Sequence, residues 1–218
     1  LWGQDLRADS PGDRAWTDFT TAPNAERRRQ YLMAVSTLLC ADLKSLVGGW
    51  EADARNYRHA FENAPGVSVQ KILTGMAMLS GFELAGERLL VAYDTQAQED
   101  EHSCFSDTTH LDVIYDIQGI LNVWEGTYGK IVDGAGVSDL AHEVDRDLAK
   151  ALDRRIRESV ALAKAVPAPF DQAILGNDNA PGRVAIMGLI ESLEEQGDLL
   201  AELGEKLGMD VPTEETDG

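Results

Sequence analysis

Side chains that could do chemistry gather in one polar stretch of the sequence, EDEHSCFSDTTHLD, at residues 99–112. Its carboxylates stand beside His102, Cys104 and His110, so oxygen, nitrogen and sulfur donors lie close together along the chain. Such a mixture suits a transition metal. However, the order H-x-C-x5-H matches no structural zinc pattern, and a polar loop is also an ordinary way to end a helical bundle. The stretch is therefore a candidate metal site that its spacing alone does not define.

His110 falls on the apolar face of a predicted helix. It shares that face with Ile114, Ile117 and Leu121 and lies in the first turn, where the helix dipole disfavours an imidazolium. A neutral imidazole at this position could bind a metal ion. The alternative is a histidine that only satisfies a hydrogen bond in the core.

Glu83 also lies within an apolar stripe, between Leu79 and Gly86 of the preceding predicted helix. A carboxylate that faces a core must be paired, protonated or bound to a metal, because burying it alone is costly. A salt bridge to an arginine of a neighbouring helix is the alternative to a ligand role. On an ideal α-helix Glu87 falls near Glu83, whereas Arg88 points to a different side.

The segment HEVDR, at residues 142–146, begins like a zinc-protease motif but lacks its second histidine. Arg146 stands where HExxH requires that ligand. The sequence also contains no GxSxG, no P-loop, and no GxGxxG between a strand and a helix. We therefore expect no self-contained protease or nucleotide site.

Apolar residues recur at steps of three and four along most of the chain, which predicts helices and no convincing strand. Gly48 and Gly49 could bend the first helix, and Gly75, Gly81 and Gly86 could permit close crossings of the second. The five predicted helices cover 24–63, 68–96, 106–129, 138–166 and 180–207. Short loops favour an all-α fold, an elongated antiparallel up-and-down bundle. A leading segment (1–23) and a mobile tail (213–218) would flank one bundle domain (24–212).

Composition describes a globular, strongly acidic chain. Its 19 basic and 38 acidic residues give a formal net charge of −19, which disfavours nucleic acid and anionic membranes and favours cations or basic partners. Solubility alone would also explain that charge. Two cysteines do not make a disulfide framework, and no apolar run approaches the roughly 20 residues of a membrane span.

The block at 79–112, LSGFELAGERLLVAYDTQAQEDEHSCFSDTTHLD, closely resembles the imelysin-like family, specifically its iron-regulated protein A branch. LWGQDL at the start of the sequence and GILNVWEGTYG at 119–129 resemble the same branch. The resemblance implies a bacterial helical protein of the periplasm or outer membrane, often a lipoprotein. It also implies a link to iron uptake and a place among peptidases.

The family's GxHxxE motif is absent from this sequence, and we expect it ahead of Leu1, in a part that would also carry an export signal or membrane anchor. By resemblance, the residues that remain supply one wall of a site for iron or another divalent transition metal. The implied metal ligands are Glu83, His102 and His110, and the implied ligand-binding residues are Glu87, Arg88 and Asp107.

Three functions follow from this reasoning. The first is an extracytoplasmic iron-linked binding protein, which takes up a metal ion or metal complex and works with iron-uptake membrane proteins. The second is a metallopeptidase of the imelysin type that uses a metal-bound water, although no catalytic residue can be assigned. The third is a non-catalytic helical interaction module, in which Glu83 pairs with an arginine and no ligand pocket exists.

Overall fold

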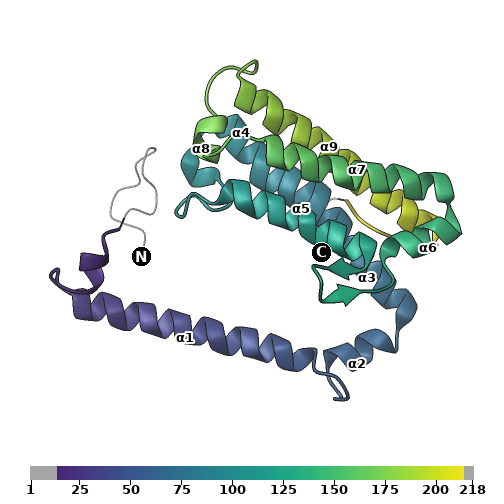
Figure 1. Ribbon diagram of the computed structural model, residues 1–218, viewed down its shortest axis with the longest axis horizontal. Coiled ribbons are helices and arrows are strands. Elements are labelled where there is room, and N and C mark those ends of the chain that lie inside the picture. The colour runs from purple at the N-terminus through teal and green to yellow at the C-terminus, as the bar shows by residue number, and fades with distance from the viewer. Residues whose placement is uncertain (1–13, 214–218) are drawn as a thin grey trace. The chain divides into compact units, whose positions relative to one another are not determined.

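The computed structural model describes residues 14–213, which leaves LWGQDL and the residues after Thr213 outside the described part. The chain is divided into two compact units, Leu1–Val69 (unit 1) and Gln70–Gly218 (unit 2). Long helices dominate both units (Figure 1), which confirms the predicted all-α class.

Unit 1 begins with a short 3-10 helix, η1 (Trp16–Phe19), followed by α1 (Ala25–Gly49) and α2 (Tyr57–Glu62). The prediction of one helix over 24–63 is therefore wrong, because α1 ends at its glycine pair and α2 starts afresh. Asn56 explains the break: its side chain caps α2 by accepting from the His59 amide and also donates to the Gly48 carbonyl at the end of α1. The ring of Trp50, edge-on to Tyr57 and Phe61, packs over the turn.

α1 carries many exposed apolar side chains, and Ala25 is its only buried residue. Among the described helices it alone is long and apolar enough to cross a membrane, judged by length and composition. The buried core helix of a soluble protein and a signal sequence pass the same test, and the apolar window of α1 is 0% buried. The predicted absence of a membrane span stays a prediction.

Unit 2 is an antiparallel bundle of four long helical segments (Figure 1). The first is a continuous run that begins in unit 1, formed by α3 (Pro65–Met78), the π-helix η2 (Leu79–Leu90) and α4 (Val91–Thr95). The other three are α5 (Thr109–Glu125), α7 (Arg146–Ala165) and α9 (Pro181–Lys206). α9 packs against both η2 and α7, and α7 packs against α5. The core between them contains fully buried Ile117, Trp124, Leu152, Ile156 and Leu189.

Two predictions about the connections in unit 2 are wrong. The helix predicted at 138–166 is split into α6 (Val137–Val144) and α7, because Asp145 has an extended backbone and its side chain accepts from the amides of Asp147 and Leu148. A short hairpin, β1 (Thr127–Tyr128) paired with β2 (Val132–Asp133), lies where no strand was expected. Its start depends on Gly126, whose φ of +70° favours glycine.

Gly81 of η2 lies at a close helix crossing, as the sequence predicted, and its partner is Gly197 of α9. A Cβ added at Gly197 would lie 3.3 Å from the Gly81 nitrogen and 3.4 Å from the Ala77 carbonyl oxygen. Gly75 has open space around it, and the nearest atom to a Cβ on Gly86 belongs to η2 itself. The crossing therefore depends on the absence of a side chain at position 197.

Adding a side chain at position 197 should destabilise unit 2. We expect Gly197→Val to lower the free energy of unfolding by about 2 kcal/mol, because its side chain would press on backbone that cannot turn aside. Gly188 of the same helix has nothing within 4 Å of an added Cβ. Gly188→Ala should therefore raise the free energy of unfolding by about 0.5 kcal/mol, because alanine has the higher helix propensity. Urea denaturation followed by circular dichroism measures both changes, and equal effects of the two variants would contradict this account.

Candidate functional site

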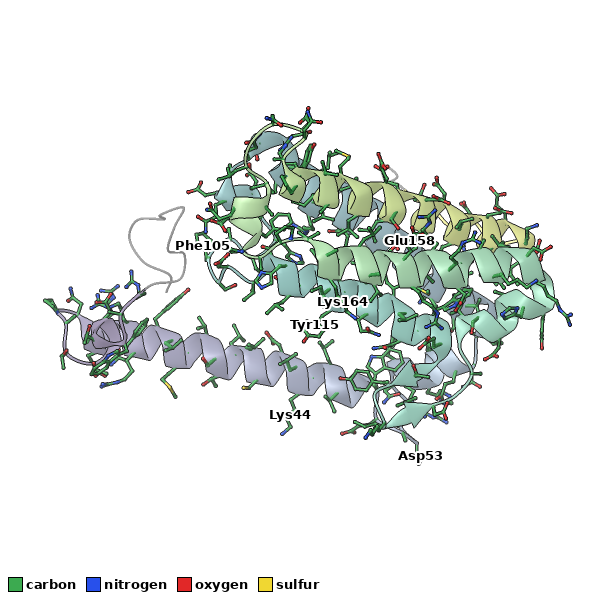
Figure 2. All side chains as sticks on the ribbon, turned by 45° about the horizontal axis from the view of Figure 1, so that its top comes forward. Lys44, Asp53, Phe105, Tyr115, Glu158 and Lys164 are labelled. Carbon is green, nitrogen blue, oxygen red and sulfur yellow. The ribbon has the colours of Figure 1, made fainter. Side chains whose placement is uncertain are left out.

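The polar stretch 99–112 supplies most of the loop between α4 and α5, together with the first turn of α5, at one end of the unit 2 bundle. Phe105 marks this loop in Figure 2. A short 3-10 helix, η3 (Gln98–Asp100), opens the loop, and α8 (Phe170–Ala173) lies at the same end (Figure 1). Gln96, in the left-handed conformation (φ +53°), ends α4. Its side-chain amide exchanges two 3.0 Å hydrogen bonds with the backbone of Gly176, which ties the loop to the segment after α8.

Arg183 holds the same end of the bundle together. Its buried guanidinium donates to the carbonyls of Tyr93 (2.6 Å) and Ile174 (3.0 Å), pairs with Asp178, and stacks 3.6 Å over the Tyr93 ring. Phe170, the first residue of α8, and Ile174, the residue after it, are fully buried. α8 is thereby fixed in place, although it is only one turn long.

Three carboxyl groups and an imidazole meet in the space so formed, and we call Glu101, Asp107, Asp171 and His110 the carboxyl cluster. Glu101 is only 6% exposed and Asp171 only 5%. Electrostatic interactions join Glu101 to Asp171 and Asp107, and join Asp107 to His110. Of ten buried side-chain polar atoms without a hydrogen bond in the described residues, five belong to this cluster, including both Glu101 carboxylate oxygens.

The pKa of Glu101 is raised from 4.5 to about 7, first by burial and then by the nearby carboxylates of Asp171 and Asp107, while the neighbouring Thr109 side chain opposes the shift. The pKa of Asp107 is also raised, first by burial and then by Asp171, and His110 opposes that change. Loss of water therefore dominates the electrostatics of the cluster. A group whose pKa lies near 7 can exchange a proton or a cation under mild conditions.

Asp107 and His110, predicted for this site, come together in the cluster. Asp107 has a φ of +56°, an unusual conformation that aspartate tolerates better than most residues, and its amide donates to the Ser103 carbonyl. His110 lies in the first turn of α5, as expected, with its Nδ1 buried and without a hydrogen bond. The predicted ligand His102 instead faces Asp116, with 3.9 Å between Nδ1 and Oδ2.

Glu83 and Arg88 form an ion pair of 3.1 Å on η2, and both side chains are more than 40% exposed. The expectation that they point to different sides is wrong, because a π-helix aligns residue i with residue i+5 where an α-helix does not. The arginine comes from the same helix and not from a neighbouring one. Glu87 is exposed on the same segment. Among the described residues, no hydrogen bond or ion pair joins Glu83 or Glu87 to the carboxyl cluster.

Sequence reasoning missed Asp171 and did not single out Glu101 from its acidic neighbours. Asp171 follows Phe170 in PAPFDQAIL, so a carboxylate inside an apolar segment was the available signal. Glu101 is the one buried member of the run at 99–101, which no spacing rule could indicate.

The cluster's donors suit a hard metal cation, since carboxylate oxygens and an imidazole are typical ligands. Within residues 14–213, however, no three His, Cys, Asp or Glu side chains are grouped closely enough to hold an ion as they stand. The donor chemistry therefore fits a metal, whereas a complete coordination shell is not formed by these residues.

A family model described as imelysin, and named for a peptidase family, matches residues 1–200 of the sequence. The match covers both units and the whole of the candidate site. No curated protein matches the chain.

The pKa of Glu101 predicts how stability changes with pH. Because that pKa is about 7 in the folded state and 4.5 without burial, the folded protein binds more protons between these values. Stability should therefore fall as pH rises from 4.5 through 7, by roughly 1 to 3 kcal/mol. Glu101→Gln should remove this part of the slope and leave the protein more stable than the wild type at pH 8.

Urea unfolding at several pH values measures the effect, and Glu99→Gln is the matched control because Glu99 is exposed two residues away. A Glu101→Gln profile with the wild-type slope would show that Glu101 does not titrate in this range.

Proposed function

The chain belongs to the imelysin family, and from that premise we propose that it is an extracytoplasmic, iron-linked binding protein whose carboxyl cluster contacts a metal ion or metal complex. We also propose that the protein is exported and that it works with iron-uptake membrane proteins. These two parts of the proposal rest on the resemblance of 79–112 to the iron-regulated protein A branch.

The observation that carries the proposal is the burial of two carboxyl groups, Glu101 and Asp171, which have few hydrogen-bond partners and interact electrostatically with each other. A buried carboxylate with too few partners is costly. Neighbouring carboxylates add to that cost, because Asp171 and Asp107 raise the pKa of Glu101 and Asp171 raises that of Asp107. A bound cation would reverse both effects, because it supplies the missing partner and neutralises the mutual repulsion. The strongly acidic composition of the chain also attracts cations towards unit 2.

His110 is the one predicted metal ligand that belongs to the carboxyl cluster, whereas Glu83 and His102 already have partners in Arg88 and Asp116. We therefore propose Glu101, Asp107, Asp171 and His110 as the main metal-facing groups. Glu83, His102, Glu87 and Arg88 would contribute only by leaving their present positions. The remaining ligands would come from the metal complex itself or from a rearranged loop, and we assign no coordination geometry.

Iron titration of the protein tests the proposal. Isothermal titration calorimetry with Fe(II) under anaerobic conditions should show saturable binding. Glu101→Gln combined with Asp171→Asn should weaken it at least tenfold, because the cluster then loses both of its buried carboxylates. Glu99→Gln combined with Asp94→Asn changes charge equally at exposed positions of the same end and should leave the affinity within about twofold.

Unchanged iron affinity in the Glu101 and Asp171 double variant would contradict the assignment of the cluster. Loss of affinity in a Glu83→Ala, His110→Ala variant with no loss in the cluster variant would favour the residues implied by resemblance instead.

A metallopeptidase is the second candidate, because the matched family carries a peptidase name and Glu101, with a pKa of about 7, has the property of a general base. The HEVDR segment gives no support, since Asp145 ends α6 between Glu143 and Arg146. Chelator-sensitive cleavage of a peptide library that Glu101→Gln abolishes would establish this activity. Cleavage that persists in the variant would assign it to a contaminant.

A further inference from the structure

A pocket at the start of α1 in unit 1 gathers cationic and aromatic side chains, and we call it the arginine pocket. Its volume is about 400 Å³, within the range of roughly 300 to 1,000 Å³ typical of small-molecule sites. Its lining residues are Arg14, Phe19, Asn24, Arg27, Arg28 and Tyr31.

Two of the three guanidinium groups are held in position by the protein. Arg28 donates from Nε to the Asp18 carbonyl (2.7 Å) and from Nη2 to the Pro23 carbonyl (2.6 Å). Arg14 pairs with the Asp18 carboxylate at 3.4 Å, and its Nε is buried without a hydrogen-bond partner. These contacts fix the directions of both groups and leave donor capacity unused on Arg14.

Arg27 differs from the other two because it forms no hydrogen bond or ion pair with any described residue, and it is exposed. The same holds for the Tyr31 hydroxyl. Of the three arginines, Arg14 alone pairs with a carboxylate, that of Asp18, in the part of the chain that the structure describes. The pocket is positively charged, although the chain as a whole carries −19.

We propose that the arginine pocket binds a small organic anion that carries two or more carboxylate or phosphate groups. Guanidinium groups bind such oxygens in pairs and are less strongly hydrated than ammonium groups. Phe19 and Tyr31 supply apolar surface for the carbon skeleton of the ligand, which a purely inorganic anion would not use. This site is separate from the carboxyl cluster and does not depend on the function proposed for it.

Calorimetric titration of the full chain with citrate and with inorganic pyrophosphate, at low ionic strength, tests the proposal. Citrate should bind saturably, and Arg27→Gln should weaken binding at least tenfold, since a hydrogen bond to a charged group contributes roughly 1.5 to 3 kcal/mol. Added salt should weaken the interaction further. Arg27 suits the test because its replacement removes no contact within the described protein.

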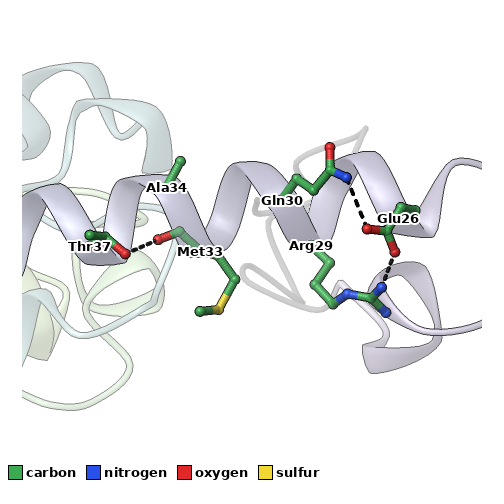
Figure 3. Close-up of a pocket in the computed structure, with 6 residues that line it drawn as sticks. All are labelled: Glu26, Arg29, Gln30, Met33, Ala34 and Thr37. Atoms are coloured by element: carbon green, nitrogen blue, oxygen red, sulfur yellow. Dashed lines mark hydrogen bonds and ion pairs between the residues drawn. The ribbon is translucent and has the colours of Figure 1, made fainter.

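Arg29→Gln provides the matched control, with the same loss of charge two residues along α1. Figure 3 shows Arg29 and Gln30 both turned to Glu26, on a different hollow of the helix. We expect this variant to keep citrate affinity within about twofold. Equal losses in the Arg27 and Arg29 variants would overturn the proposal, because a general charge effect would then explain the binding.

Vesicles of phosphatidylglycerol form the other arm of the experiment, because a lipid headgroup offers the same phosphate chemistry. Binding to these vesicles without any response to citrate or pyrophosphate would overturn the proposal, as would the absence of saturable binding to any probe. Citrate binding that depends on Arg27 would support it whether or not the protein binds iron.

Discussion

One buried cation, the guanidinium of Arg183, organises the end of the bundle that carries the candidate site. A charge that is only 4% exposed must be satisfied by the protein, and here the acceptors come from the end of α4, the residue after α8 and the loop before α9. Those segments cannot separate without leaving the cation unpaired. The position of Asp171 on α8, and with it the carboxyl cluster, follows from this requirement.

Half of the buried polar atoms without a hydrogen bond in the described residues belong to the carboxyl cluster, and the rest of the bundle is well packed. Along its length, unit 2 buries large apolar side chains and allows the backbones of η2 and α9 to approach at Gly81 and Gly197. Native proteins that break the rule of satisfied buried polar groups tend to do so at functional sites. The end with the carboxyl cluster combines a residue at positive φ with buried carboxyl groups, and the burial of one of them, Glu101, also shifts its pKa.

Much of the fold could be predicted from the sequence, because the spacing of apolar residues indicates helices and the positions of glycines indicate where they end. The all-α class, the polar loop ahead of α5 and the place of His110 in the first turn were all accessible in this way. The π-helix was not, because hydrophobic periodicity gives no sign of an i to i+5 register, and so the pairing of Glu83 with Arg88 was missed. Asp171 was missed for a different reason: it joins the site through tertiary packing across about 60 residues of sequence, which local patterns do not encode.

Charge is divided unequally between the two units, and this division agrees with the opposite charges of the ligands proposed for the two sites. Residues 1–69 hold 9 acidic and 8 basic side chains, whereas residues 70–218 hold 29 acidic and 11 basic ones. The acidic excess therefore belongs to unit 2, which contains the carboxyl cluster, and it favours cations there. The nearly neutral unit 1 contains the three arginines of the arginine pocket. A protein that handled a metal as a complex with an organic anion would need both kinds of surface. The same chain can supply each because its charges are segregated along the sequence.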